Sequence, residues 1–372
     1  MKLQPFKAEK WINDHENDCI YNLTESCVQP FKMEELLNLL GIKEKYIENL
    51  LNTTLDYGPI NGSDSLKEQI SKLYEHVSVE NIALAQGGNN ANMLVVMELF
   101  DKNDEIITFT PSYEQFSSLA KSIHATVISL PLYEEKNWMY DLNEIEKNIN
   151  SNTKAIVLIN PNNPTGTVLS ESDCLDLVKL ARKYDLYIIS DEAYRGMIVD
   201  GKEAKSFADY YEKAIVTSGL SKTYALPALR IGWIIGPKEF IERIIIRRDY
   251  DIISLSKMND MLASEVLKQK NKVIKRNIDI CLENRKIIQK WMKTEPHITN
   301  VFIQGTTQLI KYDIDMKSEM FAELIQKETG IFFVPGACYN SEYHLRLGGG
   351  LNPVVLKEGL EVFSKWLRKF DQ

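Results

Sequence analysis

The chain has 372 residues, enough for one large domain with a smaller one beside it. Hydrophobic residues make up 44% of it and charged residues 26%, which is typical of a soluble globular protein. The net charge of −8 argues against a general nucleic-acid surface and against a surface for anionic membranes.

The ends and the cysteines of the chain indicate its compartment. The start has no apolar core of signal-peptide length, and no stretch approaches the roughly 18 apolar residues of a membrane span. The five cysteines are scattered without CxxC spacing, so we expect neither a disulfide framework nor a metal site. These features predict a cytoplasmic protein without a membrane or nucleic-acid partner.

The first fifty residues predict an arm rather than a domain. Residues 1–30 look irregular, and 33–51 read as short helical pieces broken at Gly41. We expect residues 1–50 to pack on the smaller domain. Ser63 then caps a helix expected over 64–76.

From residue 82 the chain alternates between short apolar runs and amphipathic stretches. Ser170 and Asp173 form a capping-box pattern at the start of one such helix. Continuously apolar strands separated by helices predict an α/β fold, in which a mostly parallel sheet of the seven-stranded type is covered by helices on both faces. The expected strands are 82–85, 105–109, 126–130, 155–159, 186–190, 214–217 and 231–235.

The C-terminal third predicts a smaller α+β domain. About fifty helical residues follow Pro237 and include the basic cluster Arg243, Arg247 and Arg248, which we interpret as a solvated helix face. Later strands are expected at 301–303, 308–312, 331–334 and 343–347, with helices at 316–329 and 354–370. The resulting division is a large domain (51–260), a connecting helix (261–290) and a small domain (291–372).

Lys222 is the residue around which the candidate chemistry gathers. It follows the apolar run 214–216 and precedes Arg230 by eight residues. Partial shielding from water disfavours the charged form of a lysine and makes it a candidate Schiff-base amine. A guanidinium nearby suits a phosphate. The two together suggest pyridoxal phosphate, and the alternative is an ordinary surface lysine.

Two strand ends offer groups for a flat, anionic cofactor. Gly87, Gly88 and Asn89 join a strand to a helix, where backbone amides and the helix dipole form an anion site. Tyr113 lies just past the next strand and can stack on a ring. The alternatives are a tight turn without a ligand and a packed surface tyrosine.

Two further strand ends carry polar side chains. The loop 160–166 holds Asn163 between prolines and can present a carboxamide at a fixed position. Asp191 closes an apolar strand, where its charge can stabilise a protonated ring nitrogen, and Tyr194 follows three positions on. The alternative for Asp191 is a helix N-cap.

Asn163, Asp191, Lys222 and Arg230 thus fall in order at successive strand ends. Together they resemble the fold-type I pyridoxal-phosphate enzymes, in particular the class I/II aminotransferase family, and the resemblance runs from about Tyr57 to 346. It implies that Lys222 holds the cofactor in a Schiff base and shuttles the proton. It also implies that Asp191 pairs with the ring nitrogen.

The resemblance assigns the other positions as well. Asn163 and Tyr194 would bond the phenolic oxygen of the ring, and Tyr113 would stack on it. Arg346 would clamp the substrate α-carboxylate, with Asn163 also at the substrate. Tyr57 would reach the phosphate of a neighbouring subunit, which implies a homodimer with shared sites. The phosphate and its surroundings would contact Gly87, Gly88, Asn89, Ser221 and Arg230.

The sequence departs from the family pattern in three places. Gly219 stands where many members have a phosphate-binding serine, and Thr217, Ser218 or Ser221 could replace it. Segment 22–27, which often closes over substrate, lacks its usual glycine. Only Arg195 suggests itself as a partner for a dicarboxylate side chain.

The leading hypothesis is an aminotransferase that moves an amino group between an L-amino acid and a 2-oxo acid through Schiff-base chemistry on Lys222. A lyase or a cyclase of the capreomycidine-synthase kind would use the same groups, since pocket shape decides the outcome. A ligand-sensing domain of a transcription factor is the third possibility. Only some fifty residues precede the first matching motif, which leaves little room for a DNA-binding module.

Overall fold

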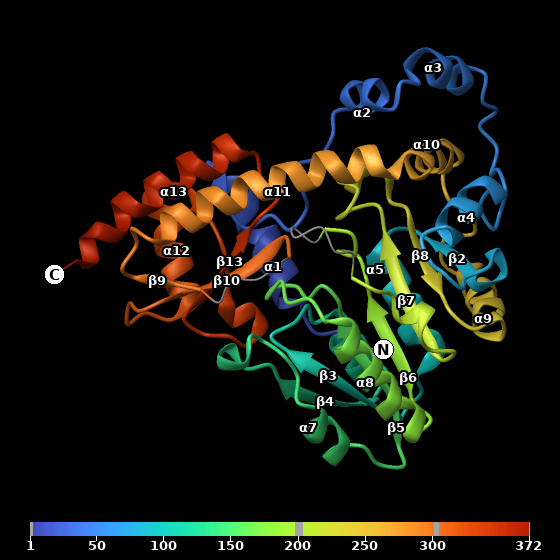
Figure 1. Cartoon of the computed structure of the whole chain (residues 1–372), viewed down its shortest axis with the longest axis horizontal. Helices are drawn as coiled ribbons and strands as arrows, with labels where there is room; N and C mark the ends of the chain where they lie inside the picture. The colour runs from blue at the N-terminus through green and yellow to red at the C-terminus, as the bar shows by residue number, and fades with distance from the viewer. Residues whose placement is uncertain (1–2, 198–203, 301–304, 372) are drawn as a thin grey trace.

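The computed structural model describes residues 3–197, 204–300 and 305–371. A seven-stranded sheet flanked by helices forms its larger part. The long helix α11 (Lys270–Met292) runs from this larger part to a smaller sheet, which has helices of its own (Figure 1). The predicted fold class, α/β with a smaller α+β part, is confirmed.

The large sheet contains the seven predicted strands, whose ends differ from the prediction by at most two residues. Their order across the sheet is β2-β8-β7-β6-β5-β3-β4. Every neighbouring pair is parallel except the two that β8 makes, with β2 and with β7. The strands are β2 (Ile82–Ala85), β3 (Glu105–Thr110), β4 (Thr126–Pro131), β5 (Thr153–Ile159), β6 (Tyr187–Asp191), β7 (Ala214–Gly219) and β8 (Gly232–Ile235).

Helices cover both faces of this sheet, because successive strand residues point to opposite sides. Ile106 and Ile107, for example, belong to two different buried clusters. One face packs on α5 (Gly88–Leu99), α6 (Gln115–Ser122) and α9 (Lys238–Arg248). The other packs on α4 (Asp64–Ser71), α7 (Leu142–Lys147), α8 (Glu171–Lys183) and α10 (Lys257–Lys268).

Caps set the starts of two of these helices. Ser170 and Asp173 form the predicted capping box of α8, and Ser63 accepts from a backbone amide at the start of α4. Helix α4 ends before the predicted residue 76. The amide of Glu75 donates instead to Asp209 at 2.7 Å, a contact that sequence periodicity does not reveal.

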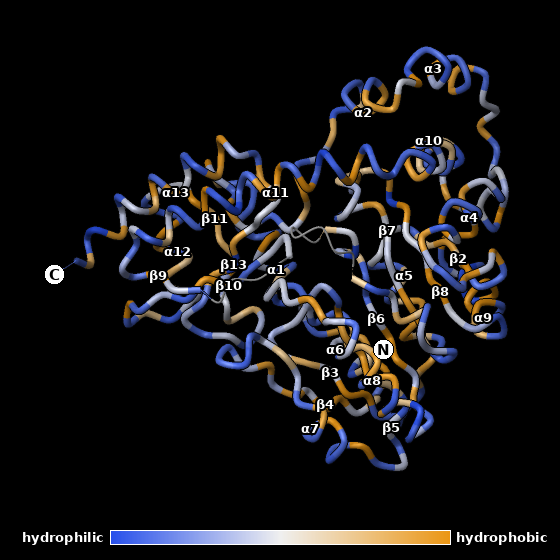
Figure 2. The backbone as a smooth tube through the Cα atoms, in the orientation of Figure 1, coloured by the Kyte–Doolittle hydropathy of each residue, from blue (hydrophilic) through white to orange (hydrophobic). Residues whose placement is uncertain are grey.

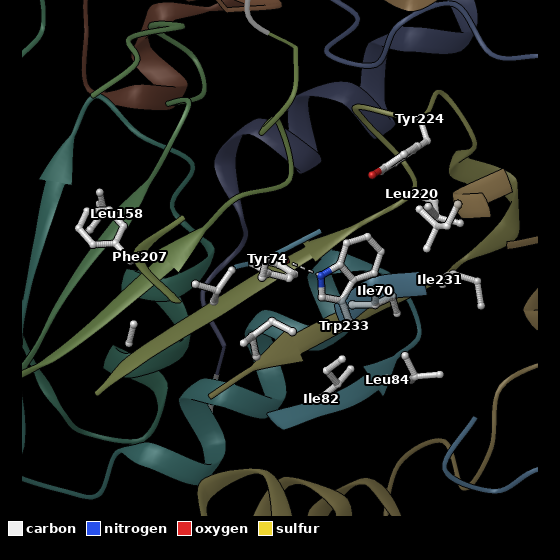
Figure 3. Close-up of a cluster of buried hydrophobic side chains, with 14 of the residues drawn as sticks. Ile70, Tyr74, Ile82, Leu84, Leu158, Phe207, Leu220, Tyr224, Ile231 and Trp233 are labelled. Atoms are coloured by element: carbon white, nitrogen blue, oxygen red, sulfur yellow. Dashed lines mark hydrogen bonds between the residues drawn. The ribbon is translucent and has the colours of Figure 1, made fainter. Parts of the chain in front are cut away.

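Hydrophobic residues concentrate along the strands and the helix faces that meet them, whereas outer loops and helix faces are mostly hydrophilic (Figure 2). Within this core, the indole of Trp233 is buried among Ile70, Leu84 and Ile231 (Figure 3). Its Nε1 donates to the hydroxyl of Tyr74 at 2.8 Å, so the buried polar atom keeps a partner.

The smaller sheet has the order β12-β13-β10-β9 and is antiparallel throughout. The predicted strand at 301–303 lies outside the described residues. The elements are β9 (Ile298–Thr299), β10 (Thr307–Tyr312), β12 (Val334–Pro335) and β13 (His344–Gly348), with α12 (Ser318–Thr329) and α13 (Pro353–Leu367) packed against them.

The N-terminal segment contains more structure than predicted. The irregular region expected over 1–30 holds the helix α1 (Lys7–His15), so that expectation is wrong. Tertiary contacts fix this helix: the Trp11 indole donates to the carbonyl of Phe333 at 2.9 Å. After it, β1 (Tyr21–Asn22) pairs in parallel with β11 (Ile331–Phe332).

The rest of the predicted arm lies against the other part of the molecule. Helices α2 (Met33–Leu40) and α3 (Lys43–Leu51) are separated at Gly41, which has a positive φ of 69°. Leu36 and Tyr46 belong to the buried cluster of the large sheet. The division into arm, large domain, connecting helix and small domain stays a prediction.

The basic cluster on α9 is solvated only in part. Arg243 and Arg247 both pair with Glu98, at 2.9 and 2.8 Å. Arg248 is fully buried and donates to the carbonyls of Ile60 and Leu84. The expectation of a solvated face is therefore wrong for Arg248, because this guanidinium satisfies buried backbone oxygens.

Candidate active site

A cavity of about 410 Å³ lies where β5, β6 and β7 end, facing the N-terminal segment and β13. Ten of the predicted site residues line it, although they come from distant parts of the chain. They are Gly88, Asn89, Tyr113, Asn163, Asp191, Tyr194, Ser221, Lys222, Arg230 and Arg346.

Asp191 is the last residue of β6 and is held in place by neighbours on the same sheet. Its carboxylate accepts from Asn92 Nδ2 at 2.8 Å and from the amide of Ala193 at 3.0 Å. Thr217 donates to Asn92 Oδ1 at 2.6 Å and so orients the carboxamide. Burial raises the pKa of Asp191, while Asn92 and the charge of Lys222 oppose the shift.

Lys222 lies just past β7 and reaches the N-terminal segment. Its Nζ donates to Ser26 Oγ at 2.8 Å and lies 3.2 Å from Cys27 Sγ. Burial lowers the pKa of Lys222, but Tyr194, Cys27 and Glu25 raise it more, and the net shift is upward. Shielding from water thus disfavours the charged form as expected, but the surrounding groups outweigh it and favour the ammonium.

One end of the cavity lies at the N-terminus of α5 and is suited to a phosphate group. Arg230, in the left-handed conformation with φ of 47°, donates toward Ser221 Oγ and the carbonyl of Gln86, both at 3.4 Å. Within the described residues it has no carboxylate partner. A Cβ at Gly87, outside the cavity lining, would lie 2.4 Å from this guanidinium. Glycine therefore lets the arginine approach the helix start.

The structure discriminates among the hydroxyls proposed to replace the missing serine. Thr217 is used by Asn92, and Ser218 donates to the carbonyl of Glu192, whereas Ser221 lines the cavity. Gly219 also lines it, and a Cβ there would lie 2.8 Å from a backbone oxygen. Crowding of the backbone thus disfavours any side chain at 219.

Arg346 on β13 is a buried cation with neutral partners. Only 3% exposed, it donates through Nε to Thr24 and through Nη1 to the hydroxyl of Tyr339 at 2.7 Å. Asn163 Oδ1 lies 3.5 Å from the same nitrogen. No carboxylate of the described chain forms an ion pair with it. An unpaired buried guanidinium in a cavity is suited to an anionic group.

This geometry agrees with the comparison to known families. The family model "Aminotransferase class I and II" matches residues 32–363. The chain belongs to this family. It is accordingly a pyridoxal-phosphate-dependent enzyme, and the predicted family, enzyme class and cofactor are confirmed.

Individual relatives extend over nearly the whole aminotransferase. An aspartate aminotransferase of Pyrococcus horikoshii is 27% identical over 359 residues, which cover 90% of this chain and 92% of that protein. A crystal structure of a PLP-dependent aminotransferase from Streptococcus suis is 34% identical, covers 100% of both chains and has a TM-score of 0.96. The PLP-dependent cyclase OrfR, 20% identical with a TM-score of 0.91 over 100% of this chain and 98% of its own, shares the fold.

Besides Gly87, two predicted residues of the aminotransferase lie outside the cavity lining. Tyr57 is 69% exposed on the surface. Arg195, the candidate for a dicarboxylate side chain, pairs with Glu192 at 3.3 Å, donates to the carbonyl of Leu73 and covers the ring of Tyr74. The suggestion that Arg195 contacts substrate is therefore wrong: its contacts hold the core together.

The sequence alone did not predict most of the residues that form the N-terminal wall of the cavity. Segment 22–27 was named as a covering segment, but not for its side chains. Tyr113 donates to a carboxylate of α1 at 2.6 Å, a contact that depends on where that helix docks. The residues of this wall are Glu9, Glu16, Glu25, Ser26 and Cys27. No local pattern in the sequence marks them as part of a site.

Proposed function

We propose that the enzyme transfers an amino group between an L-amino acid and a 2-oxo acid in this cavity, with Lys222 as the cofactor-bearing amine. The observation that carries the proposal is that Lys222, Asp191 and Arg346 line one cavity. They offer an amine, a buried carboxylate and an unpaired guanidinium, which are the groups the reaction needs.

The residues present fit pyridoxal phosphate. Arg230, without a carboxylate partner and next to the amides that begin α5, would hold the phosphate together with Ser221. Asp191 would face the ring nitrogen, and Asn163 and Tyr194 the phenolic oxygen. Gly87, Gly88, Asn89 and Tyr113 would complete the cradle.

When bound, pyridoxal phosphate supplies an electron sink for the bonds at the substrate Cα. Arg346 would bind the α-carboxylate and thereby orient the bond to be broken. Lys222 Nζ would take the Cα proton and return it, as a general base and acid. The N-terminal wall would exclude water from that exchange.

We also propose a homodimer with shared sites. Tyr57 and Leu55 expose apolar surface beside Lys257, which pairs with Asp56 at 3.0 Å. Such a patch suits burial by a second copy, and Tyr57 would then reach the phosphate of the partner's site. Mixing the inactive variants Lys222→Ala and Tyr57→Ala should restore part of the activity; failure of the mixture to exceed either variant would oppose shared sites.

A cytoplasmic location completes the proposal, together with the absence of nucleic-acid partners. In the described portion, no helix combines the length and the apolarity needed to cross a bilayer. All five cysteines are free thiols, and four are buried, as suits a reducing compartment. The net charge of −8 disfavours nucleic-acid binding.

A half-reaction tests the proposal. The holoenzyme mixed with one amino acid and no 2-oxo acid should convert stoichiometrically to the amino form of the cofactor, seen in its absorbance, with release of one 2-oxo acid. Release of ammonia or of a cyclic product over many turnovers would instead establish the lyase or cyclase alternative.

A further inference from the structure

The N-terminal wall of the cavity carries three carboxylates, Glu9, Glu16 and Glu25, which we call the acidic wall. All three line the cavity that contains Lys222 and Arg346. Each is half-buried. No lysine, arginine or histidine of the described chain forms an ion pair with any of them.

Their existing contacts leave hydrogen-bond capacity free. Glu9 accepts a hydrogen bond from the hydroxyl of Tyr113. Glu16 accepts one from the side-chain Nδ2 of Asn22 at 3.1 Å, and Glu25 accepts one from the backbone N–H of Cys27 at 2.7 Å. Each of these bonds uses one carboxylate oxygen. A carboxylate can accept about four hydrogen bonds, so the wall keeps acceptors facing the cavity.

The three carboxylates also act on one another. Burial raises the pKa of Glu16, and the negative charges of Glu25 and Glu9 raise it further, while Arg346 opposes the shift. Burial also raises the pKa of Glu25, but Lys222, the backbone amide of Cys27 and Arg346 lower it more, so these cations partly balance the wall. The carboxylates nevertheless lie close enough together for Glu25 and Glu9 to exert repulsion on Glu16. A cation placed there would relieve it.

The cations of the cavity do not compensate this wall once the proposed function operates. Arg230 would be occupied by phosphate, Arg346 by the substrate carboxylate and Lys222 by the cofactor. This accounting rests on the proposed function. It leaves the acidic wall unbalanced, and a substrate with a second carboxylate would add to the repulsion.

We infer that the enzyme's preferred amino acid carries a cationic side chain, an amine or a guanidinium, which binds the acidic wall while its α-carboxylate binds Arg346. Two fixed charged ends of opposite sign would then select a dipolar substrate. Arg346, buried and without an ion-pair partner in the described chain, marks the other end.

The first test compares pairs of amino acids on the wild-type holoenzyme. Arginine and citrulline have nearly the same shape and differ in charge; lysine and norleucine form a second pair, and aspartate is the acidic case. We expect kcat/KM for at least one cationic member to exceed its neutral counterpart about tenfold or more, mainly through KM. Equal values within each pair, or a preference for aspartate, would overturn the inference and leave the proposed function standing.

The second test does not need turnover. Titration calorimetry of the holoenzyme with 6-aminohexanoate and with hexanoate compares two carboxylates that differ in the terminal ammonium. The amino compound should bind about tenfold more tightly. Equal binding would refute the inference even if no amino acid reacts, whereas a failure of all amino acids to react would count against the proposed function alone.

Variants assign the effect to the wall. Glu16→Gln and Glu25→Gln remove one charge each and keep the shape, so each should lower the cationic-to-neutral ratio at least fivefold. Glu323→Gln, on the exposed side of α12, removes a carboxylate elsewhere and should leave the ratio unchanged. If the cationic-to-neutral ratio of kcat/KM is unchanged by both wall substitutions, these carboxylates do not bind the side chain of the substrate.

Discussion

The cavity has two walls that differ in how they are held. The sheet wall carries Asp191 and Lys222 at strand ends and is fixed by its own neighbours, as when Asn92 binds Asp191. The acidic wall is held by contacts between segments that are distant in sequence, such as the hydrogen bond from the Trp11 indole to the carbonyl of Phe333. We infer that the topology of the sheet places the reacting groups, while a separately docked layer selects the substrate.

The largest effect should come from the sheet wall. Lys222→Ala should lower turnover of every amino acid by roughly a thousandfold or more, because it removes both the cofactor link and the proton carrier. Borohydride reduction followed by mass spectrometry should find no cofactor attached. Lys179→Ala, exposed on α8, should change neither. A reducible link in the Lys222 variant would contradict the role assigned to it.

Asp191→Ala should retain the cofactor but lower turnover by about 10²- to 10⁴-fold, again for all substrates alike, because the ring nitrogen loses its anionic partner. Absorbance of bound cofactor and steady-state rates check this expectation. Near-normal turnover would remove Asp191 from the mechanism.

Arg346→Lys keeps the charge and loses the planar fork. We expect kcat/KM to fall by roughly ten- to a hundredfold for cationic and neutral amino acids equally, since both carry the α-carboxylate. A change confined to one class would show that the two ends of the site are not separate.

A change in the core should touch neither wall. Tyr74→Phe leaves the indole of Trp233 buried without its acceptor and should lower the free energy of unfolding by about 1–3 kcal/mol. Urea unfolding measures this, and substrate ratios should stay constant. A shifted ratio at unchanged stability would break the separation between core and site.

The smallest effect concerns His297, which is not part of the cavity lining. Its bond to Asp313 raises its pKa, and Asp371 adds to this. A raised pKa in the folded state means a stabilising contribution that is full below the unfolded value of about 6.5 and lost as pH rises through the folded value. His297→Gln should flatten that decline in unfolding measurements; an unchanged pH profile would exclude it.

The sequence predicted the sheet wall well and the acidic wall poorly, for a physical reason. Asp191 and Lys222 follow apolar strands, and parallel strands bring their ends to one edge, so local patterns suffice. Glu16 comes from a region whose helix forms through contacts some three hundred residues away in sequence. The net direction of the Lys222 pKa shift was not predicted for the same reason, because burial is outweighed by Tyr194, Cys27 and Glu25, two of which belong to the N-terminal segment.

The short pairing of β1 with β11 has a consequence for how the site would discriminate between substrates of different length. Leu23 extends it by donating from its amide to the carbonyl of Phe332 at 3.2 Å, and its own carbonyl accepts from the amide of Gly348 on β13 at 2.8 Å, two residues past Arg346. The segments that carry Glu25 and Arg346 are thus hydrogen-bonded to each other. This connection would fix the span between the two charged ends of the proposed substrate site, so a substrate of the wrong length would be rejected.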